Sequence, residues 1–498
     1  MFKKVLVANR GEIAIRVMRA CRELGIKTVA VYSEADQESL HVRYADECYC
    51  IGPPLPAESY LNIKKIVEAT KTSNSEGIHP GYGFLAQIPA FAEACESEGI
   101  EFIGPSSEVL RKLSNKVTAR RTVANADVPV IPGSMTPFKD ESEAAKVAEE
   151  VGYPVLVKAV YGGGGRGLRL VRDRDEISQA VELARLEAET SFGNPQLYVE
   201  KLLDKPRHIE FQILADKKGN IIHLGERECS IQRRYQKLME ETPSPMMTKE
   251  LRKAMGEMAI EAAKTANCTS VFTAEFLVDK QGEFYFLETN TRLQVEHLIT
   301  EMVTGIDIVK EQIRMAAGEE LQYKQEDVTM RGHAINCRIN SEDPYKDFIP
   351  YPGTVTRYLP PGGPGVRVDS ALYNGYTIPV FYDSLIAKLA AWGATREEAI
   401  LRLQNALNEY VIEGIKTTIP FQQRILGDEY FRKGKIHTGF VHERIGSLAA
   451  EEEHEGEEVA ALSAVLASYI RHREEGLAVI PRRKPQGAST WKHPRVGW

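Results

Sequence analysis

The start of the chain alternates between strand and helix patterns, and this alternation constrains the fold most. Residues 3–8 (KKVLVA) form a short apolar run typical of a buried strand. Apolar side chains then recur at helical spacing over 12–24, Gly25 ends that pattern, and 27–32 (KTVAVY) is a second strand-like run. A strand, a helix and a strand in so short a stretch predict a βαβ unit, and hence a doubly wound α/β domain with a parallel sheet. No G-x-G-x-x-G follows the first strand, which argues against a dinucleotide site.

The composition excludes several classes of protein. The 498 residues are 43% hydrophobic and 27% charged, which is typical of a globular protein with about three domains. The net charge of −7 argues against a generally basic nucleic-acid binder. The seven cysteines include no C-x-x-C pair, so we expect neither a disulfide framework nor a zinc ribbon. No apolar run approaches the ~18 residues of a membrane span, and no signal-peptide pattern is present, so we expect a cytoplasmic protein.

A run of four glycines follows a strand-like segment within residues 158–169, KAVYGGGGRGLR. Such a run leaves backbone N–H groups free to turn toward phosphate oxygens, and Lys158 adds a positive charge. It is not a P-loop, because no G-K-[ST] ends it. We interpret it as a lid that closes over a nucleotide and excludes water, the alternative being a flexible loop without a ligand.

Two β-rich runs, 271–278 and 283–287, are joined by the turn sequence DKQG and predict a hairpin. With a two- or four-residue loop, Glu275 and Glu288 become diagonal neighbours on one face, roughly 7–8 Å apart at the backbone. Two carboxylates at this separation can bind Mg²⁺, which prefers oxygen ligands. A three-residue loop would place them on opposite faces, and this prediction would fail.

The segment ETNTRLQVEH carries polar side chains at every second position. If it is extended, these side chains form one continuous face that offers a metal ligand, an amide, a guanidinium, an amide and a carboxylate. A solvated strand face is the alternative interpretation. The residues are Glu288, Asn290, Arg292, Gln294 and Glu296.

Three shorter stretches also suggest a binding site. The loop HPGYGF, residues 79–84, has the glycines and proline of a tight functional loop, although turn chemistry alone would explain them. Arg338 lies in an apolar strand-like run, GHAINCRIN, where an arginine usually has a defined partner or ligand. A basic group suits an anionic substrate, and a solvated surface is an equally good interpretation. That group consists of Gln232, Arg233, Arg234 and Lys237.

The last fifty residues differ from the rest of the chain. Residues 451–458 (EEEHEGEE) are an acidic, solvated run, and 459–470 are a short apolar helix candidate. Residues 481–498 combine basic side chains with two tryptophans. We interpret this end of the chain as a docking element.

Together these stretches resemble the biotin carboxylase family, a branch of the ATP-grasp enzymes. The resemblance covers residues 1–447 and keeps the order of the family's motifs. The motifs are ANRGEIA-R, HPGYGF, KA…GGGGRG, PRHIEFQ, RECSIQRR-QK, ETNTRLQVEH, GHAI-CRIN-EDP and YDSLIAKL.

The resemblance implies an α/β ATP-grasp fold and a division of the chain. A Rossmann-like N-terminal domain is expected over 1–113, and the first part of the ATP-grasp domain over 114–203, including a mobile lid at about 132–203. The second ATP-grasp part and a C-terminal domain are expected over 204–447, and a partner-docking extension over 448–498.

The implied reaction is the carboxylation of biotin by bicarbonate, which ATP activates as carboxyphosphate in the presence of Mg²⁺ or Mn²⁺. No Met-Lys-Met-like biotinylation site occurs, so we expect biotin on a separate carboxyl carrier and the carboxyltransferase on another chain. The C-terminal extension resembles those of two-subunit pyruvate carboxylases, which favours pyruvate as the acceptor. Acetyl-CoA or propionyl-CoA is the alternative acceptor, and another ATP-grasp ligase or a weakened scaffold protein is the alternative function.

The resemblance also assigns roles to residues. The implied nucleotide contacts are Lys116, Lys158, Gly164, Gly165, Glu200, Lys201, Leu202, Leu203, His208, Gln232 and Tyr235. The implied metal ligands are Glu275, Glu288 and Asn290, and the implied bicarbonate contacts are Lys237, Arg292 and Val295. Glu296 resembles the base that deprotonates bicarbonate, Arg338 the cation that stabilises the biotin ureido oxygen, and Tyr82 lies in the loop near biotin. Matches at Arg16, Arg19 and Glu23 imply a homodimer.

Several positions depart from the family pattern without removing a core catalytic residue. Tyr235 replaces a common His, 86–88 (AQI) replaces Ser-Glu-Asn, Asn115 replaces Asp, Phe272 replaces Gly and Asn336 replaces Glu. These departures predict slower turnover or an unusual partner interface.

Overall fold

The computed structural model describes residues 1–162, 167–448, 463 and 465–469. The chain divides into two units, Met1–Ala449 and Ala450–Trp498. In the second unit, the described residues 465–469 are helical and exposed. The acidic run 451–458, the basic segment 481–498 and most of the predicted helix over 459–470 lie outside the described residues.

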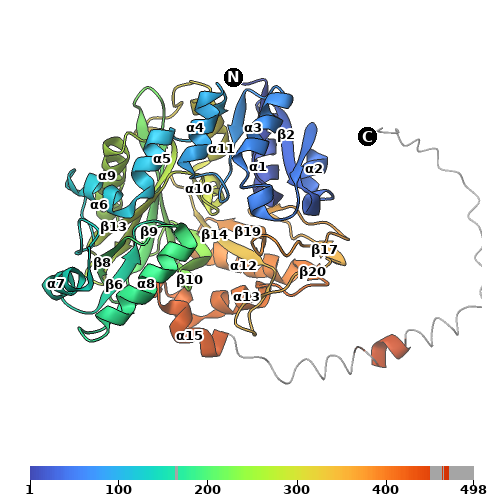
Figure 1. The fold of residues 1–498 in the computed structure, drawn as a ribbon. Helices are drawn as coiled ribbons and strands as arrows, with labels where there is room; N and C mark the ends of the chain where they lie inside the picture. Colours follow the sequence, from blue (N-terminus) through green and yellow to red (C-terminus); the bar gives the residue numbers. More distant parts are fainter. Residues whose placement is uncertain (163–166, 449–462, 464, 470–498) are drawn as a thin grey trace, which may run out of the picture. The chain divides into compact units, whose positions relative to one another are not determined.

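The N-terminal part of the first unit, blue in Figure 1, contains a parallel sheet. This sheet has five strands in the order β3-β2-β1-β4-β5. Its strands are β1 (Lys4–Val7), β2 (Lys27–Ser33), β3 (Glu47–Gly52), β4 (Gly77–His79) and β5 (Glu101–Phe102). Its helices are α1 (Gly11–Glu23), α2 (Leu40–Tyr44), α3 (Ile63–Thr72), α4 (Pro89–Ser97) and α5 (Ser107–Ser114), with 3-10 turns η1 (Glu34–Asp36) and η2 (Pro56–Glu58). Val5 and Val7 belong to one core and Leu6 and Ala8 to another, so both faces of β1 are covered. The predicted βαβ opening is confirmed.

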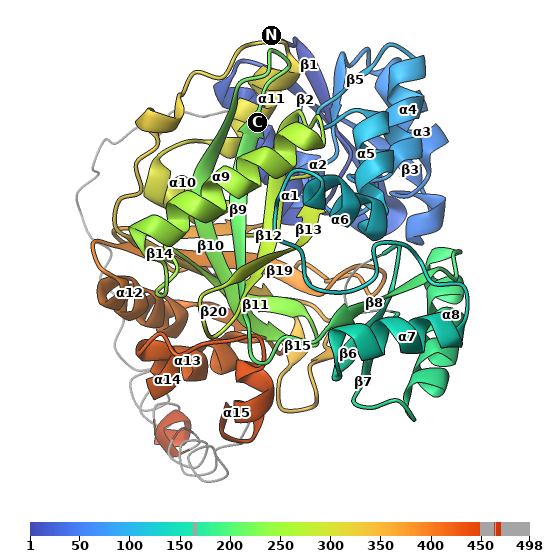
Figure 2. The same cartoon turned by 90° about the vertical axis from the view of Figure 1, so that its left-hand side faces the viewer.

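A smaller antiparallel sheet with its own core follows in the chain (Figure 2). Its strands have the order β7-β6-β8 and are β6 (Val155–Ala159), β7 (Leu168–Val171) and β8 (Leu197–Lys201). The nearby helices are α6 (Lys116–Ala124), α7 (Glu141–Val151) and α8 (Ile177–Phe192). The glycine run joins β6 to β7, and its residues 163–166, including Gly164 and Gly165, lie outside the described residues.

An eight-stranded antiparallel sheet forms the largest layer, with the order β13-β12-β9-β10-β11-β14-β19-β18. The strands are β9 (Arg207–Ala215), β10 (Ile221–Arg233), β11 (Gln236–Thr242), β12 (Ser270–Val278), β13 (Phe284–Asn290), β14 (His333–Asn340), β18 (Val366–Ser370) and β19 (Leu385–Gly393). On β9, Ile209 and Phe211 pack in an apolar core with α9 (Lys249–Thr265), whereas His208 and Glu210 alternate with them and are also buried. One face of this sheet is therefore apolar core, and the other is a buried polar face.

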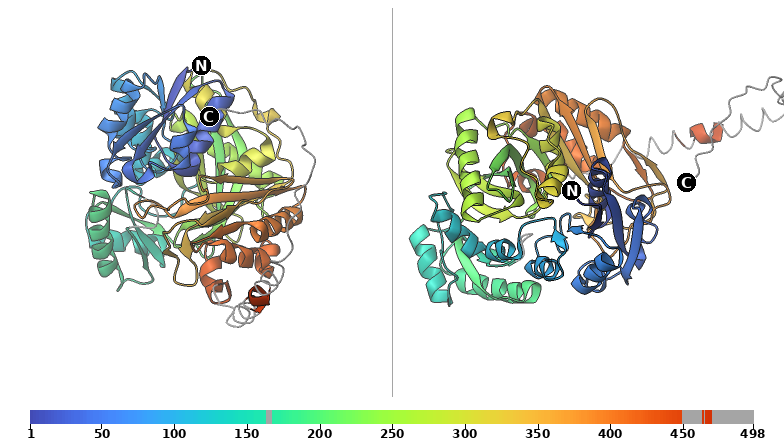
Figure 3. Two further views of the ribbon diagram at one scale, coloured as in Figure 1. Left: turned by 90° about the vertical axis from the view of Figure 1, so that its right-hand side faces the viewer. Right: turned by 90° about the horizontal axis from the view of Figure 1, so that it is seen from above.

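The remaining elements belong to the second half of the first unit, which is yellow to red in Figure 3. The helices are α10 (His297–Thr304), α11 (Ile308–Ala316), α12 (Arg396–Glu409), α13 (Ile419–Gly427), α14 (Glu429–Arg432) and α15 (Phe440–Leu448), with the 3-10 turn η3 (Gln325–Asp327). Two small sheets pair β15 (Glu342–Asp343) with β16 (Ile349–Pro350), and β17 (Arg357–Leu359) with β20 (Val411–Glu413). Within the described part of the chain, every helix is too short or too polar to cross a bilayer.

The hairpin of β12 and β13 is present, but its register differs from the predicted one. Its loop spans 279–283, an odd number of residues, and Val278 pairs with Phe284. This loop alone would place Glu275 and Glu288 on opposite faces of the sheet. A β-bulge in β13 takes up one further residue, so that Glu275 lies directly opposite Glu288. The two carboxylates share a face because the bulge compensates for the odd loop.

The predicted extended segment from Glu288 to Glu296 ends early. Strand β13 stops at Asn290, and residues 291–296 turn before α10 begins at His297. The prediction of one continuous strand face is therefore wrong beyond Asn290. The turn brings Glu296 back toward the polar face of the sheet by a different route.

Phe276 tests the packing of the apolar face. Its buried ring lies 6.3 Å from that of Phe211 and 6.1 Å from that of Phe286, measured between ring centroids. We expect Phe276→Ala to lower the free energy of unfolding by about 3–5 kcal/mol, because it removes a fully buried ring and leaves a cavity. Urea unfolding measures this loss. Phe381→Ala, at a ring that is 41% exposed, is the matched control and should cost less than ~1 kcal/mol. A loss of similar size in both variants would contradict the packing described.

Candidate active site

A buried cluster of charged side chains occupies the polar face of the eight-stranded sheet. At its centre, the Nζ of Lys237 on β11 lies 2.6 Å from Glu210, 2.7 Å from Glu296 and 3.2 Å from Glu275. These carboxylates come from β9, the turn before α10, and β12. Burial by itself would lower the pKa of Lys237, but the surrounding anionic groups hold it well above its ordinary value. One ammonium thus joins three separate segments of the chain.

Glu296 is the most enclosed carboxylate of the cluster, with a side chain that is 0% exposed. Its Oε1 accepts a hydrogen bond from Lys237, and its Oε2 accepts one from Nη2 of Arg338 at 3.0 Å. Burial acts to raise the pKa of Glu296, but Lys237, Arg338 and Arg227 outweigh it and hold the pKa well below 4.5. Glu296 is therefore ionised and held in one orientation, as a general base must be.

Arg338 on β14 has the defined partner that its apolar surroundings predict. Its Nε donates to Glu240 at 2.6 Å, and Asn336 donates to the other oxygen of Glu240 at 2.7 Å. Burial lowers the pKa of Arg338, but Glu240 and Glu296 raise it by more. The side chain of Arg338 is 19% exposed, whereas those of Glu240 and Glu296 are 0% exposed, so Arg338 is the member of this group that a ligand can reach.

Arg292 differs from the other cations of the cluster, because its hydrogen-bond acceptors among the described residues are neutral. Its Nε donates to Gln87 at 2.6 Å, Nη1 to Gln294 at 2.8 Å, and Nη2 to Asn290 at 3.1 Å. Burial lowers the pKa of Arg292. An anion that enters the site can therefore form a charge-assisted hydrogen bond with a guanidinium that no carboxylate has neutralised through a hydrogen bond.

The predicted metal ligands lie around one pair of opposing strand positions. Glu275 and Glu288 are paired in register, and Asn290 donates its amide N–H to Glu275 at 2.8 Å. His208 Nε2 lies 2.9 Å from Glu275, and Lys116 Nζ lies 2.9 Å from Glu288. Carboxylate and amide oxygens are the ligands that Mg²⁺ prefers, so this donor set fits the ion. The two neighbouring basic side chains suit phosphate groups that accompany it.

Lys158, a predicted nucleotide contact, and Arg120, which was not predicted, both pair with Glu200 near the end of β8. Lys158 on β6 lies 2.7 Å from Glu200, and Arg120 on α6 lies 2.6 Å from its other oxygen. Burial lowers the pKa of Lys116, but Glu288 raises it by more. Lys116 thus connects this group to the predicted metal ligands.

The other predicted contacts lie on several separate segments of the chain. Lys201 ends β8, and Leu202 and Leu203 follow it directly. Val295 is half-buried in the turn between Arg292 and Glu296. Gln232 pairs in register with Lys237 at the end of β10. Tyr82 lies in the HPGYGF loop, and its hydroxyl donates to Glu12.

The basic group of the β10–β11 hairpin is split between two places. Lys237 belongs to the buried cluster, but Arg233 and Arg234 both form ion pairs with Asp347. This one carboxylate therefore offsets one of their two positive charges at the turn. The prediction of a single basic group is therefore wrong, because Lys237 lies apart from these two arginines. Their contact with an anionic substrate stays a prediction.

The residues that depart from the family pattern occupy four kinds of position: an exposed turn, a helix cap, the apolar core and the charged cluster. Tyr235 is 55% exposed in the β10–β11 turn, where its φ is 63°. Asn115 caps α6, as an aspartate would, and Phe272 is fully buried in the apolar core. Asn336 and Gln87 donate or accept hydrogen bonds within the charged cluster.

Sequence reasoning missed Glu210, Arg227 and Glu240. Arg227 is fully buried and donates to Glu210 at 2.5 Å and to Gln212 at 2.8 Å. A sequence signal for this polar face does exist. Polar and apolar residues alternate in HIEFQ, which places His208, Glu210 and Gln212 on one face of the strand.

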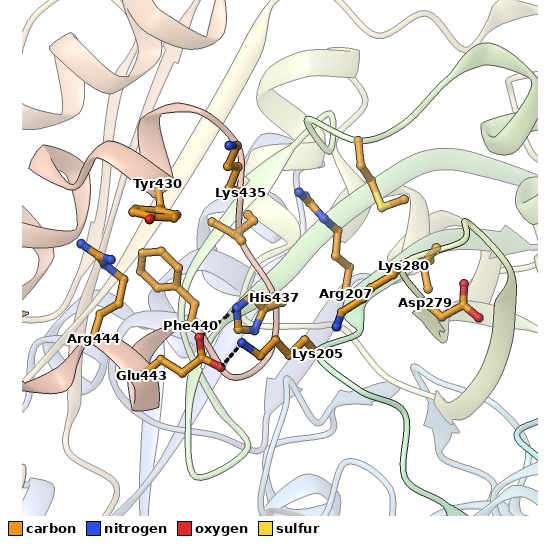
Figure 4. Close-up of a pocket in the computed structure, with 13 residues that line it drawn as sticks. Lys205, Arg207, Asp279, Lys280, Tyr430, Lys435, His437, Phe440, Glu443 and Arg444 are labelled. Carbon is orange, nitrogen blue, oxygen red and sulfur yellow. Dashed lines mark ion pairs between the residues drawn. The ribbon is translucent and has the colours of Figure 1, made fainter.

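A separate hollow of about 570 Å³ lies beside the start of β9 and the end of β12 (Figure 4). None of the predicted site residues that the structure describes lines it. The residues that line it are Lys205, Arg207, Met246, Val278, Asp279, Lys280, Tyr430, Lys435, Ile436, His437, Phe440, Glu443 and Arg444. Lys205 pairs with Glu443 at 2.8 Å and Arg444 with Asp428 at 2.6 Å, so much of the positive charge here is already balanced.

Three sequence families match successive parts of the chain. The N-terminal domain of biotin carboxylase matches residues 1–110, and the C-terminal domain of biotin carboxylase matches 336–443. Between them, the ATP-binding domain of the carbamoyl-phosphate synthase L chain matches 115–324.

Known proteins match over nearly the whole chain. A pyruvate carboxylase subunit of Methanothermobacter thermautotrophicus is 54% identical over 490 residues, covering 95% of this chain and 100% of that protein. Biotin carboxylase 1 of Bacillus subtilis is 54% identical over 442 residues, covering 89% and 98%. The 2-oxoglutarate carboxylase small subunit of Hydrogenobacter thermophilus is 51% identical over 470 residues, covering 94% and 99%.

Solved structures share the fold. The biotin carboxylase domain dimer of Hydrogenobacter thermophilus 2-oxoglutarate carboxylase, in complex with MgADP, ADP and bicarbonate, has a TM-score of 0.88 and 51% identity over 91% of this chain and 100% of its own. Biotin carboxylase of Campylobacter jejuni has a TM-score of 0.87 and 45% identity over 89% and 99%. The predicted ATP-grasp fold is confirmed, and the chain belongs to the biotin carboxylase family.

Proposed function

We propose that this chain catalyses the MgATP- and bicarbonate-dependent carboxylation of biotin held on a separate carrier protein, through carboxyphosphate. The observation that carries the proposal is the buried, ionised Glu296, fixed between Lys237 and Arg338 on the polar face of the sheet. The relative in complex with MgADP and bicarbonate supports these substrates.

In the first step, Arg292 pairs with the bicarbonate anion, beside Val295 and Lys237. Glu296 removes the proton of bicarbonate, and an oxygen of the resulting carbonate attacks the γ-phosphate of ATP. ADP leaves and carboxyphosphate forms. Lys237, Arg338 and Arg227 hold the pKa of Glu296 low, so the carboxylate is ionised at neutral pH and has a lone pair that can receive this proton.

In the second step, the ureido nitrogen of biotin loses its proton to the departing phosphate and takes up the carboxyl group of carboxyphosphate. Arg338 stabilises the negative charge that develops on the ureido oxygen. Protonation of Glu296 weakens its ion pair with Arg338, which leaves Nη2 of Arg338 free to turn toward biotin. Tyr82 contacts the same substrate from the HPGYGF loop.

The nucleotide binds between the small sheet and the polar face of the large sheet. Lys116 and Lys158 contact its phosphates. Glu275, Glu288 and Asn290 hold Mg²⁺ or Mn²⁺, which neutralises phosphate charge when bound. The further nucleotide contacts are Gly164, Gly165, Glu200, Lys201, Leu202, Leu203, His208, Gln232 and Tyr235.

The chain works with a carboxyl carrier and a carboxyltransferase on other chains, and the final acceptor is pyruvate. The pyruvate carboxylase relative aligns over 490 residues, further than the 442 of biotin carboxylase 1, which supports this acceptor. The 2-oxoglutarate carboxylase relative aligns over 470 residues and makes 2-oxoglutarate a competing acceptor beside acetyl-CoA and propionyl-CoA.

The protein forms a homodimer, as the solved relative does. Of the three residues predicted at the interface, Arg19 and Glu23 are exposed. Arg16 is buried within its own chain, where it pairs with Glu301 at 2.8 Å.

Glu296→Gln tests the assignment of the base. The amide keeps the shape of the side chain but cannot accept a proton, so we expect kcat for bicarbonate-dependent, biotin-stimulated ATP hydrolysis to fall about 10²–10⁴-fold. Glu283→Gln, at an exposed carboxylate on the β12–β13 hairpin, is the matched control and should keep wild-type activity. Wild-type activity in Glu296→Gln would contradict the role of Glu296, and no stimulation of the wild type by biotin would contradict the proposed function.

Glu288→Gln tests the metal site. Removing one anionic ligand should raise the Mg²⁺ concentration that gives half-maximal ATP hydrolysis at least tenfold, because Mg²⁺ prefers charged oxygen ligands. A Mg²⁺ titration at saturating ATP measures the change, again with Glu283→Gln as the control. An unchanged Mg²⁺ requirement would show that Glu288 pairs only with Lys116.

Removal of residues 450–498 tests the docking role of the C-terminal extension. We expect the truncated protein to carboxylate free biotin at the wild-type rate and to bind its carboxyltransferase partner at least tenfold more weakly. Pull-down and titration with the purified partner measure binding. Equal binding by both proteins would contradict the docking role.

A further inference from the structure

Tyr82 is held by two contacts that the proposed mechanism does not use. Its loop is anchored by Asn9, whose Nδ2 donates to the carbonyl oxygens of Pro80 at 2.8 Å and of Tyr82 at 2.7 Å. Gly81 and Gly83 flank it with φ of 63° and 68°, a conformation that glycine adopts without strain. The backbone thus presents the ring at a fixed position, and the hydroxyl donates to Glu12.

Glu12 lies in the first turn of α1 and connects Tyr82 to a fully buried lysine. While Oε1 of Glu12 accepts from Tyr82, Oε2 lies 2.9 Å from Nζ of Lys388 on β19. The side chain of Lys388 is 0% exposed, and its Nζ lies 5.7 Å from the centre of the Tyr82 ring. A buried lysine needs carboxylate partners, and Asp369 at 3.6 Å supplies the second one.

Lys388 is also the direct neighbour of the arginine assigned to biotin. It pairs in register with Arg338 on β14 and with Asp369 on β18. Residues opposite one another in antiparallel strands project from the same face, so Asp369, Lys388 and Arg338 form one row across the sheet. Tyr82 belongs to the N-terminal sheet domain and Arg338 to the large sheet, and the pair of Glu12 with Lys388 joins the two.

We propose that Glu12 and Lys388 are positioning residues that fix Tyr82 relative to Arg338 and thereby set the affinity for biotin. The inference rests on the proposed function, in which Tyr82 and Arg338 contact biotin. Neither Glu12 nor Lys388 touches a substrate in this arrangement; both act through their neighbours.

Glu12→Gln removes the ion pair with Lys388 but keeps the size of the side chain. We expect the KM for free biotin in bicarbonate-dependent ATP hydrolysis to rise at least threefold. The KM for MgATP and the rate without biotin should stay within twofold, because Glu12 lies outside the nucleotide site. Glu68→Gln, at an exposed position on α3, is the matched control. A smaller rise in the biotin KM would overturn the inference.

A double-mutant cycle shows whether Glu12 acts through Tyr82. Tyr82→Phe removes only the hydroxyl that Glu12 accepts from. If the two residues act as one unit, the double variant should have the biotin KM of the more affected single variant. Multiplicative effects would overturn the inference. Thermal unfolding of each variant checks that the fold is retained. Lys388→Met removes the other member of the ion pair and should raise the biotin KM in the same way as Glu12→Gln.

The pH dependence of the biotin KM gives an independent measurement. Burial raises the pKa of Glu12 to about 7, against the opposing effect of Lys388. As the pH falls through 7, Glu12 takes up a proton and loses its ion pair, so the wild-type KM should rise between pH 8 and pH 6 more steeply than that of Glu12→Gln. Burial acts to raise the pKa of Asp369 and to lower that of Arg367, but neighbouring charges outweigh it in both, so they stay charged in this range. The groups that face Glu12 are Tyr82, Arg367, Asp369 and Lys388.

The outcomes distinguish a failure of the proposed function from a failure of the positioning role. If biotin does not stimulate the wild-type protein, the proposed function fails, and the inference fails with it. If biotin stimulates the wild type and Glu12→Gln keeps the same biotin KM and the same pH profile, the inference alone fails.

Discussion

The ion pairs of Lys237 hold the polar face of the large sheet together. A single ammonium, on a side chain that is 12% exposed, contacts Glu210, Glu275 and Glu296, which come from three separate segments. Buried charges are costly unless they are paired and hydrogen-bonded, and removing one partner leaves the others uncompensated. The positions of β9, β12 and the turn before α10 therefore depend on one another. This dependence keeps Glu296 ionised and in place, and it explains why the site can be buried and charged at once.

The arginines of the site differ in whether a carboxylate neutralises them, and this difference determines which of them can attract an anion. Arg227 and Arg338 are bound to carboxylates, whereas Arg292 is held by the amides of Gln87, Gln294 and Asn290. A guanidinium without a hydrogen-bonded carboxylate retains more of its attraction for an incoming anion. The same polar face thus places a guanidinium without a hydrogen-bonded carboxylate near the ionised Glu296, and the proposed activation of bicarbonate depends on this arrangement.

The departures from the family pattern change local contacts more than the layout of the site. Phe272 fills the apolar core behind the sheet, and Asn115 caps its helix with a side-chain oxygen. Gln87 places a neutral oxygen against Arg292. Tyr235 lies at an exposed turn with left-handed backbone geometry, where a large side chain is strained unless a contact holds it. None of these residues displaces Glu296, Lys237 or Arg338.

The sequence by itself determined the βαβ opening and the β12–β13 hairpin, because periodicity and turn residues act locally. Its motifs also named the residues to which the proposed chemistry is assigned. Tertiary structure decided how those residues meet. The bulge that sets Glu275 opposite Glu288 compensates for an odd loop, and no local pattern predicted it. Glu296 reaches Lys237 through a turn rather than along a strand, and Lys388 reaches Glu12 across two domains. Pairing between distant segments depends on strand register and on the balance of buried charge, which only the complete fold specifies.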